Sequence, residues 1–110
     1  MAPDSDGQLW IAQEKFQQSF CQDLPEDEAL VMAVTQKAPL GVTFAARPAW
    51  RAKPSWYQVS TEDRMIDPDN QRRMAARMNP RRTIELASSH ASLASHPVEI
   101  VDLIEEASRA

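Results

Sequence analysis

Two residues with the chemistry of acid–base catalysis, Asp63 and His90, each follow a short run of β-forming residues. Residues 55–60 (SWYQVS) precede Asp63, and residues 83–87 (TIELA) precede His90. A carboxylate that orients a histidine forms the acid–base part of a Ser-His-Asp system. We therefore interpret Asp63 as a candidate catalytic acid and His90 as a candidate catalytic base, on the condition that the fold brings them together.

The segment between the two predicted strands carries the signals of a helix. Asp67 can cap its start, and Pro68 suits the first helical position, where its missing N–H is not needed. Asn79-Pro80 ends the helix. A strand, a helix and a strand form a βαβ unit, which predicts parallel strands and a right-handed crossover. Asp63 and His90 then lie at the same edge of the sheet, where open α/β sheets bind ligands.

Further helices are predicted on both sides of this unit. Apolar residues at helical spacing predict one helix over residues 9–22, although residues 8–11 also suit a short strand. A second helix runs from Pro25 to about residue 36, with three acidic residues in its first turn. Residues 37–53 contain prolines and no clean period, which is typical of a connector.

The last predicted helix begins near Pro97 and runs to about residue 108. His96 or Ser95 is expected to cap this helix. An apolar face at i, i+3, i+4 and i+7 includes Ile100 and Ile104, and it should cover the sheet. A histidine at a helix entry suits capping, so His90 is preferred over His96 as the catalytic base.

A set of short motifs around these elements has a common pattern. From about Asp6 onward the chain resembles the C-terminal half of an α/β-hydrolase of the small esterase and hydroxynitrile-lyase-like branch. The residues that carry the resemblance are Ala49-Trp50, Pro54-Ser55-Trp56-Tyr57, Glu62-Asp63-Arg64-Met65-Ile66, Pro68, Gln71, Met74-Ala75, Ser89-His90-Ala91 and Ser95-His96-Pro97.

The resemblance implies an α/β fold made of the C-terminal portion of an α/β-hydrolase: two parallel strands with their crossover, C-terminal helices, and a preceding helical lid. Residues 1–52 would be the lid segment and connector, and residues 53–110 the C-terminal part of the core. Asp63 matches the catalytic acid of the family and His90 its catalytic histidine. The implied substrate is a small-molecule carboxylic ester or related acyl compound, and no cofactor is implied. Hydroxynitrile-type C–C cleavage uses the same residues, so the sequence does not decide between that reaction and ester hydrolysis.

The nucleophile of such a hydrolase has no match in the sequence. The elbow motif G-x-S-x-G needs two glycines four residues apart, whereas this chain has only Gly7 and Gly41. Ser88, Ser89 and Ser92 lie near His90 but form no elbow. We therefore expect the isolated chain to be inactive and to self-associate or pair with a complementary chain. The alternative is a non-catalytic truncated remnant or interaction module that docks through an exposed sheet edge.

Composition narrows the remaining classes of function. The chain has 110 residues, 43% hydrophobic and 25% charged residues, and a net charge of −4, which fits one globular unit. This charge gives no general affinity for nucleic acid, so we interpret the arginines between residues 64 and 82 as a solvated surface.

The single Cys21 has no disulfide partner and no metal-binding pattern around it. No signal peptide or membrane span is recognised, which predicts a cytoplasmic protein.

Overall fold

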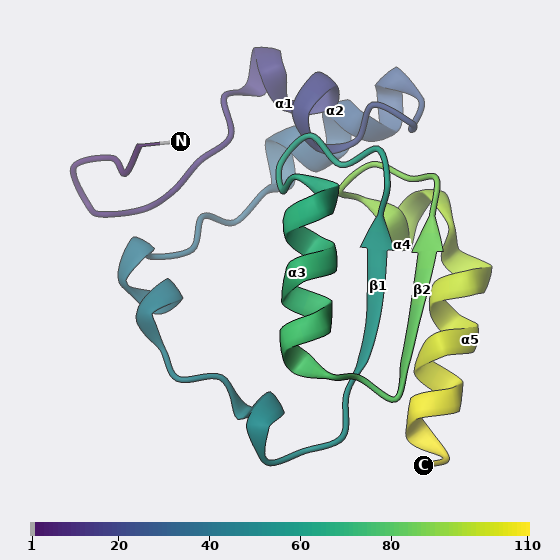
Figure 1. Cartoon of the computed structure of the whole chain (residues 1–110). Helices are drawn as coiled ribbons and strands as arrows, with labels where there is room; N and C mark the ends of the chain where they lie inside the picture. The colour runs from purple at the N-terminus through teal and green to yellow at the C-terminus, as the bar shows by residue number, and fades with distance from the viewer. Residues whose placement is uncertain (1) are drawn as a thin grey trace.

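The computed structural model describes residues 2–110. Parallel strands β1 and β2 form a sheet between helices, with α3 on one side and α5 on the other (Figure 1). In chain order the elements are α1 (Gln13–Phe20), α2 (Glu26–Thr35), the short 3₁₀ helices η1 (Gly41–Ala45) and η2 (Ala49–Arg51), β1 (Trp56–Ser60), α3 (Pro68–Met78), β2 (Arg82–Leu86), α4 (Ser92–Ser95) and α5 (Pro97–Ser108).

The predicted βαβ unit is confirmed. Strands β1 and β2 pair in parallel, with Trp56 opposite Arg82 and Ser60 opposite Leu86. The observed strands differ from the predicted ranges by one residue at their ends. Parallel pairing places both C-terminal strand ends at one edge, so the loops that carry Asp63 and His90 leave the sheet side by side (Figure 1).

Helix α3 begins and ends where its capping residues predict. The Asp67 carboxylate accepts hydrogen bonds from the amides of Asp69 and Asn70, and Pro68 occupies the first turn. Asn79 closes the helix in the left-handed conformation, with φ of 49°, which short polar residues tolerate better than most. These caps fix the start of α3 just after the loop of the candidate acid.

Helices α1 and α2 pack against each other above the C-terminal edge of the strands (Figure 1). Their shared core contains Phe16, Cys21 and Leu24 together with Ala29, Ala33 and Ala91. Ala91 follows His90 directly, so the loop that carries His90 packs against the helical pair after it leaves the sheet. The apolar spacing of the sequence thus produces a core that reaches the candidate site.

The start of α1 corrects one prediction. The helix begins at Gln13 rather than near residue 9, and Gln8 and Leu9 form β-bridges instead, which is closer to the alternative of a short strand at residues 8–11. Isolated bridges pair Pro3 with Leu9 and Gln8 with Leu40. The bridge to Leu40 and the bond from the Leu9 amide to the Pro39 carbonyl tie this stretch to a distant segment, and these contacts outweigh the local helical spacing, which is a weak preference. The connector also contains more local structure than the sequence indicated, in η1 and η2.

The end of the chain corrects two further predictions. His96 stands at the N-cap position of α5, but neither its ring nor Ser95 caps the helix. Instead the Ser95 hydroxyl lies 3.0 Å from His96 Nδ1. The apolar face of α5 covers the sheet incompletely, since no residue of α5 is buried and Ile104 is 59% exposed.

Within residues 2–110, no helix combines the length and the apolar character that crossing a membrane requires. The cytoplasmic location stays a prediction.

Candidate active site

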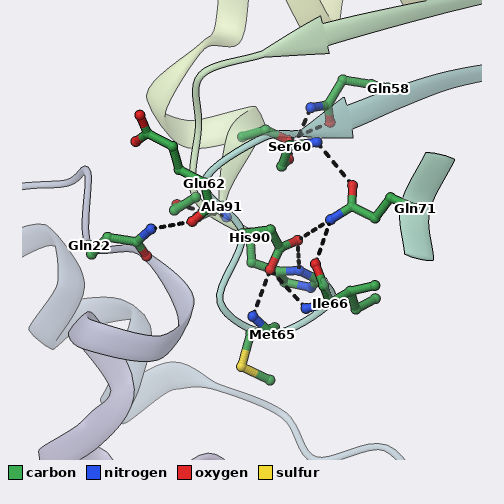
Figure 2. A network of polar contacts seen from close by, with 12 residues as sticks. Gln22, Gln58, Ser60, Glu62, Met65, Ile66, Gln71, His90 and Ala91 are labelled. Atoms are coloured by element: carbon green, nitrogen blue, oxygen red, sulfur yellow. Dashed lines mark hydrogen bonds and ion pairs between the residues drawn. The ribbon is translucent and has the colours of Figure 1, made fainter. Parts of the chain in front are cut away.

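The Asp63 carboxylate contacts four groups at the C-terminal edge of the sheet, and Figure 2 shows the residues that supply them, Met65, Ile66, Gln71 and His90. Its Oδ1 accepts hydrogen bonds from the amides of Met65 at 2.7 Å and Ile66 at 3.0 Å. Its Oδ2 lies 2.8 Å from His90 Nδ1 and accepts a 2.8 Å bond from the Gln71 side chain. The side chain is 3% exposed. A buried carboxylate needs such partners, and together they hold it in one orientation.

His90 is held at one nitrogen and is half-buried. Its Nδ1 faces Asp63, and its side chain is 32% exposed. The Phe20 ring of α1 meets the imidazole edge-on, with ring centroids 5.0 Å apart. A carboxylate at Nδ1 favours the tautomer that carries its proton there, which leaves Nε2 as a proton acceptor. The structure therefore brings the sequence-predicted pair together, with His90 Nδ1 facing the Asp63 carboxylate.

Gln71 is a member of the site whose role the sequence did not reveal. Its Oε1 accepts a 2.9 Å bond from the Ser60 amide at the end of β1. Its Nε2 donates to Asp63 Oδ2 and to the carbonyl of Ile66 at 2.9 Å. Gln71 thus ties the strand end, the acid loop and the carboxylate to one side chain of α3. It lies four residues before buried Ala75, so a polar residue on the inward helical face was the available signal.

A cavity of about 450 Å³ opens beside His90. It lies between the helical pair, the connector and the acid loop. Hydrophobic side chains dominate its walls, and among the described residues Lys37 lines it but no acidic side chain does. The lining residues are Leu9, Ile11, Phe16, Phe20, Met32, Thr35, Gln36, Lys37, Pro39, Phe44, Met65 and His90.

The hydroxyls of Ser89 and Ser92, close to His90 in the sequence, have structural contacts. Ser88 and Ser89 are fully buried, and the Ser89 hydroxyl accepts a bond from the Ala91 amide. The Ser92 hydroxyl donates to the Gln58 side chain at 2.9 Å. None of these three side chains forms a hydrogen bond with the His90 ring in the described part of the chain, which agrees with the absence of a nucleophile elbow in the sequence.

Burial alters the ionisation of two groups near the site. Burial raises the pKa of the Cys21 thiol, and the charge of Asp23 raises it further. A thiol kept in its neutral form is a poor nucleophile. Burial likewise raises the pKa of Tyr57, and the Asp63 carboxylate adds to this effect.

The arginines make contacts that the sequence interpretation described only in part. Arg72 pairs with Asp69 at 2.7 Å and with Glu85 at 2.6 Å, as expected for a surface balanced by acids. Arg77, however, lies over the ring of Trp50, with 5.6 Å from its guanidinium carbon to the ring centroid. Arg81 lies over Trp56 in the same way. The two tryptophans come from segments that are distant from these arginines in the sequence.

Comparison with known families agrees with this architecture. The model of the alpha/beta hydrolase family matches residues 1–103. The chain therefore belongs to the alpha/beta hydrolase family. A comparison with curated proteins found no match.

Proposed function

We propose that this chain supplies the catalytic acid and histidine of an α/β-hydrolase that cleaves a carboxylic ester or a related acyl bond. The supporting observation is the 2.8 Å contact between Asp63 Oδ2 and His90 Nδ1 at the C-terminal edge of two parallel strands. Family membership supports the same reaction class. In this proposal residues 53–110 are the C-terminal part of the hydrolase core.

The proposed reaction needs a serine from polypeptide other than these 110 residues. The serine hydroxyl attacks the acyl carbon while His90 takes its proton at Nε2. His90 then gives that proton to the departing alcohol, which leaves an acyl-enzyme. Water hydrolyses the acyl-enzyme by the same proton transfers in the second half of the reaction. The Asp63 carboxylate accepts a hydrogen bond from the Nδ1–H group of His90 and stabilises the imidazolium that forms in each step.

The cavity beside His90 supports a largely apolar substrate without a positive charge. Its volume of about 450 Å³ lies within the usual range for small-molecule sites. Within residues 2–110, its walls contain no carboxylate that could pair with a buried cation, and an unpaired buried charge is costly. In this proposal α1 and α2 act as the lid, since they supply much of the wall and lie above the strand ends (Figure 1).

The second candidate is an interaction module without catalysis. It is supported by the apolar side chains that remain exposed far from the cavity, among them Val98 and Ile104 of α5. Strand β1 also has no strand partner on its other edge within residues 2–110, and such an edge is prone to pairing. A polypeptide that covers these surfaces and carries the serine would support the first proposal, and one that covers them without a nucleophile would support the second.

The test joins this chain to the nucleophile-bearing half of a related α/β-hydrolase and measures hydrolysis of p-nitrophenyl butyrate. The fusion should turn over the ester. His90→Ala and Asp63→Asn should each lower kcat by about 10³-fold or more, because the first loses the base and the second favours the wrong tautomer. His96→Ala is the matched control and should change kcat less than about twofold, because His96 contacts Ser95 and not Asp63.

Two results would contradict the proposal. A folded fusion whose His96→Ala variant is inactive while His90→Ala is active would mean that the base is wrongly assigned. Ester turnover by the isolated chain above its own His90→Ala variant would mean that the chain contains a nucleophile. The isolated chain should otherwise show no such difference, because the nucleophile and the oxyanion donors provide most of the rate enhancement in acyl transfer.

A further inference from the structure

The end of α1 and the turn that follows it contact both catalytic loops. We propose that residues 18–23, here called the clamp, fix the acid loop and the histidine loop relative to each other, and that Asp23 is a positioning residue for His90. The inference rests on the proposed function only in taking Asp63 and His90 as the catalytic pair. The contacts that support it are present whether or not the chain is catalytic.

The clamp holds the backbone on both sides of His90. The Asp23 carboxylate accepts a 2.8 Å hydrogen bond from the Ser89 amide. The Phe20 carbonyl accepts a 3.1 Å bond from the Ala91 amide. The two amides that flank His90 therefore both donate to the clamp, while the Phe20 ring packs against the imidazole itself. With both neighbours fixed, the His90 Cα can move little.

The clamp also contacts both neighbours of Asp63. The Gln22 side chain donates to the Glu62 carbonyl at 2.6 Å (Figure 2). The Arg64 guanidinium donates to the Gln18 carbonyl at 3.0 Å and to the Gln18 side chain at 3.1 Å. The same six-residue segment thus binds the residue before and the residue after each member of the pair. The clamp thus adds to the direct bond between the two loops, in which the Glu62 amide donates to the Ser88 carbonyl at 3.1 Å.

The clamp is itself anchored in the core. Cys21 is fully buried and Leu24 nearly so, and the Leu24 amide donates to the Cys21 carbonyl at 3.0 Å to close the turn. The Gln17 side chain donates to the Leu24 carbonyl at 3.2 Å. A turn held by buried residues on both sides of Asp23 gives the carboxylate a fixed position from which to hold Ser89.

Asp23 has the ionisation that this role needs. Burial acts to raise the pKa of Asp23, but hydrogen bonds, chiefly from Ser89, outweigh it and leave the pKa below its usual value. The carboxylate is therefore charged at neutral pH, and a charge-assisted bond to an amide is stronger than a neutral one. Ser89 is fully buried, so its amide has no ready access to water if Asp23 is truncated.

The experiment measures the His90 imidazole by NMR in the 110-residue chain, where no nucleophile is needed. The readouts are the ring ¹⁵N shifts, which report the tautomer, and the rate at which the Nδ1 proton exchanges with water. Asp23→Ala should raise that exchange rate about tenfold or more and mix the tautomers, because the loop that carries His90 loses one of its two amide bonds to the clamp. Asp23→Asn keeps an acceptor oxygen and should stay within about threefold of the wild type.

A matched control separates positioning from loss of stability. Leu103→Ala truncates a half-buried side chain of α5 that lies near residues 53–56, at the opposite end of the strands. It should lower the melting temperature without altering the His90 shifts or the exchange rate. If Asp23→Ala does not fold, Gln22→Ala removes only the contact to the acid loop and should still accelerate exchange relative to Leu103→Ala.

Two outcomes would overturn the inference. One is a folded Asp23→Ala chain whose His90 shifts and exchange rate equal those of the wild type. The other is a Leu103→Ala chain that changes the His90 signals as much as Asp23→Ala does. In the active fusion, Asp23→Ala should lower kcat with little change in KM. A fusion that never turns over ester would count against the proposed function and leave the NMR result unaffected.

Discussion

The two ends of the β1–β2 sheet differ in how completely they are packed. At the C-terminal end, Val59 and Ser60 of β1 and the loop serines Ser88 and Ser89 are buried. At the N-terminal end, Arg82 and Thr83 are exposed, and α5 beside the strands buries no residue. The polar network of Figure 2 surrounds the C-terminal end, whereas the ion pair of Arg82 with Glu106 at the N-terminal end is exposed. The chain is most fully packed where Asp63 and His90 lie.

This difference shows which contacts hold the acid–histidine pair. A sheet of two strands is marginal by itself. The site end adds Gln71 from α3 and the clamp from the helical pair, so its geometry does not depend on the poorly covered remainder of the sheet. At the other end, the C-terminal half of α5 lies near residues 53–56 and leaves Ile104 exposed to solvent. We expect substitutions at the two ends to differ accordingly.

The largest effect is expected for Gln71→Leu. The change leaves the Ser60 amide without its 2.9 Å acceptor and removes a donor from Asp63. Each buried group left unpaired costs about 1–3 kcal/mol, so the free energy of unfolding should fall by about 2–4 kcal/mol. Urea unfolding, monitored by tryptophan fluorescence, measures this free energy of unfolding. In the active fusion, kcat should also fall, because the carboxylate is less well oriented.

Asn70→Leu is the control for this substitution. Asn70 carries the same side-chain amide one position earlier on α3, but it is exposed. Asn70→Leu should lower the free energy of unfolding by less than about 0.5 kcal/mol, as surface changes usually do. Equal losses for the two variants would mean that α3 tolerates leucine poorly and that the bonds of Gln71 contribute little.

The sequence predicted the βαβ unit well because its signals are local. The Asp67 cap, Pro68 and Asn79-Pro80 mark the helix ends within a few residues, and parallel pairing then follows from chain connectivity. The same reasoning brought Asp63 and His90 to one edge. Local signals could not reveal the contacts between distant segments, such as Asp23 with Ser89 or Gln8 with Leu40.

The errors have the same origin. Residues 9–12 have helical spacing, yet bridges to other segments hold the start of this stretch extended. Ser95 and His96 have the position of a cap, but the serine hydroxyl contacts the imidazole instead of a free helix amide. The role of Gln71 depends on three groups from β1 and the acid loop, which no helical pattern specifies.

A smaller effect is expected for charges placed on the poorly covered end. Ile104→Lys puts a charge on the exposed face of α5 and should reduce self-association, which we expect because apolar residues and a strand edge are open to solvent. Sedimentation velocity over a range of concentrations should show less oligomer than the wild type, with the unfolding free energy changed by less than about 0.5 kcal/mol.

Glu105→Lys serves as the control, since it adds a lysine to the same helix at an already polar and exposed position. It should change association less than Ile104→Lys does. A wild-type chain that remains monomeric at all concentrations would contradict the expectation that this end forms an interface.

The smallest effect is expected for the pH dependence contributed by Asp23. Its pKa in the folded chain lies below the ordinary value of 3.8, so the unfolded chain binds a proton before the folded chain does. The stability from its charge is therefore fully present above about pH 4 and is lost as the pH falls through the folded pKa. Asp23→Asn should be less stable than the wild type at pH 6, by up to about 1 kcal/mol as for one hydrogen bond, and the gap should narrow at pH 3.

Urea titrations at both pH values measure the gap, with Asp102→Asn on exposed α5 as the charge-matched control. A gap that stays constant or widens at pH 3 would mean that the Asp23 charge does not stabilise the fold through Ser89.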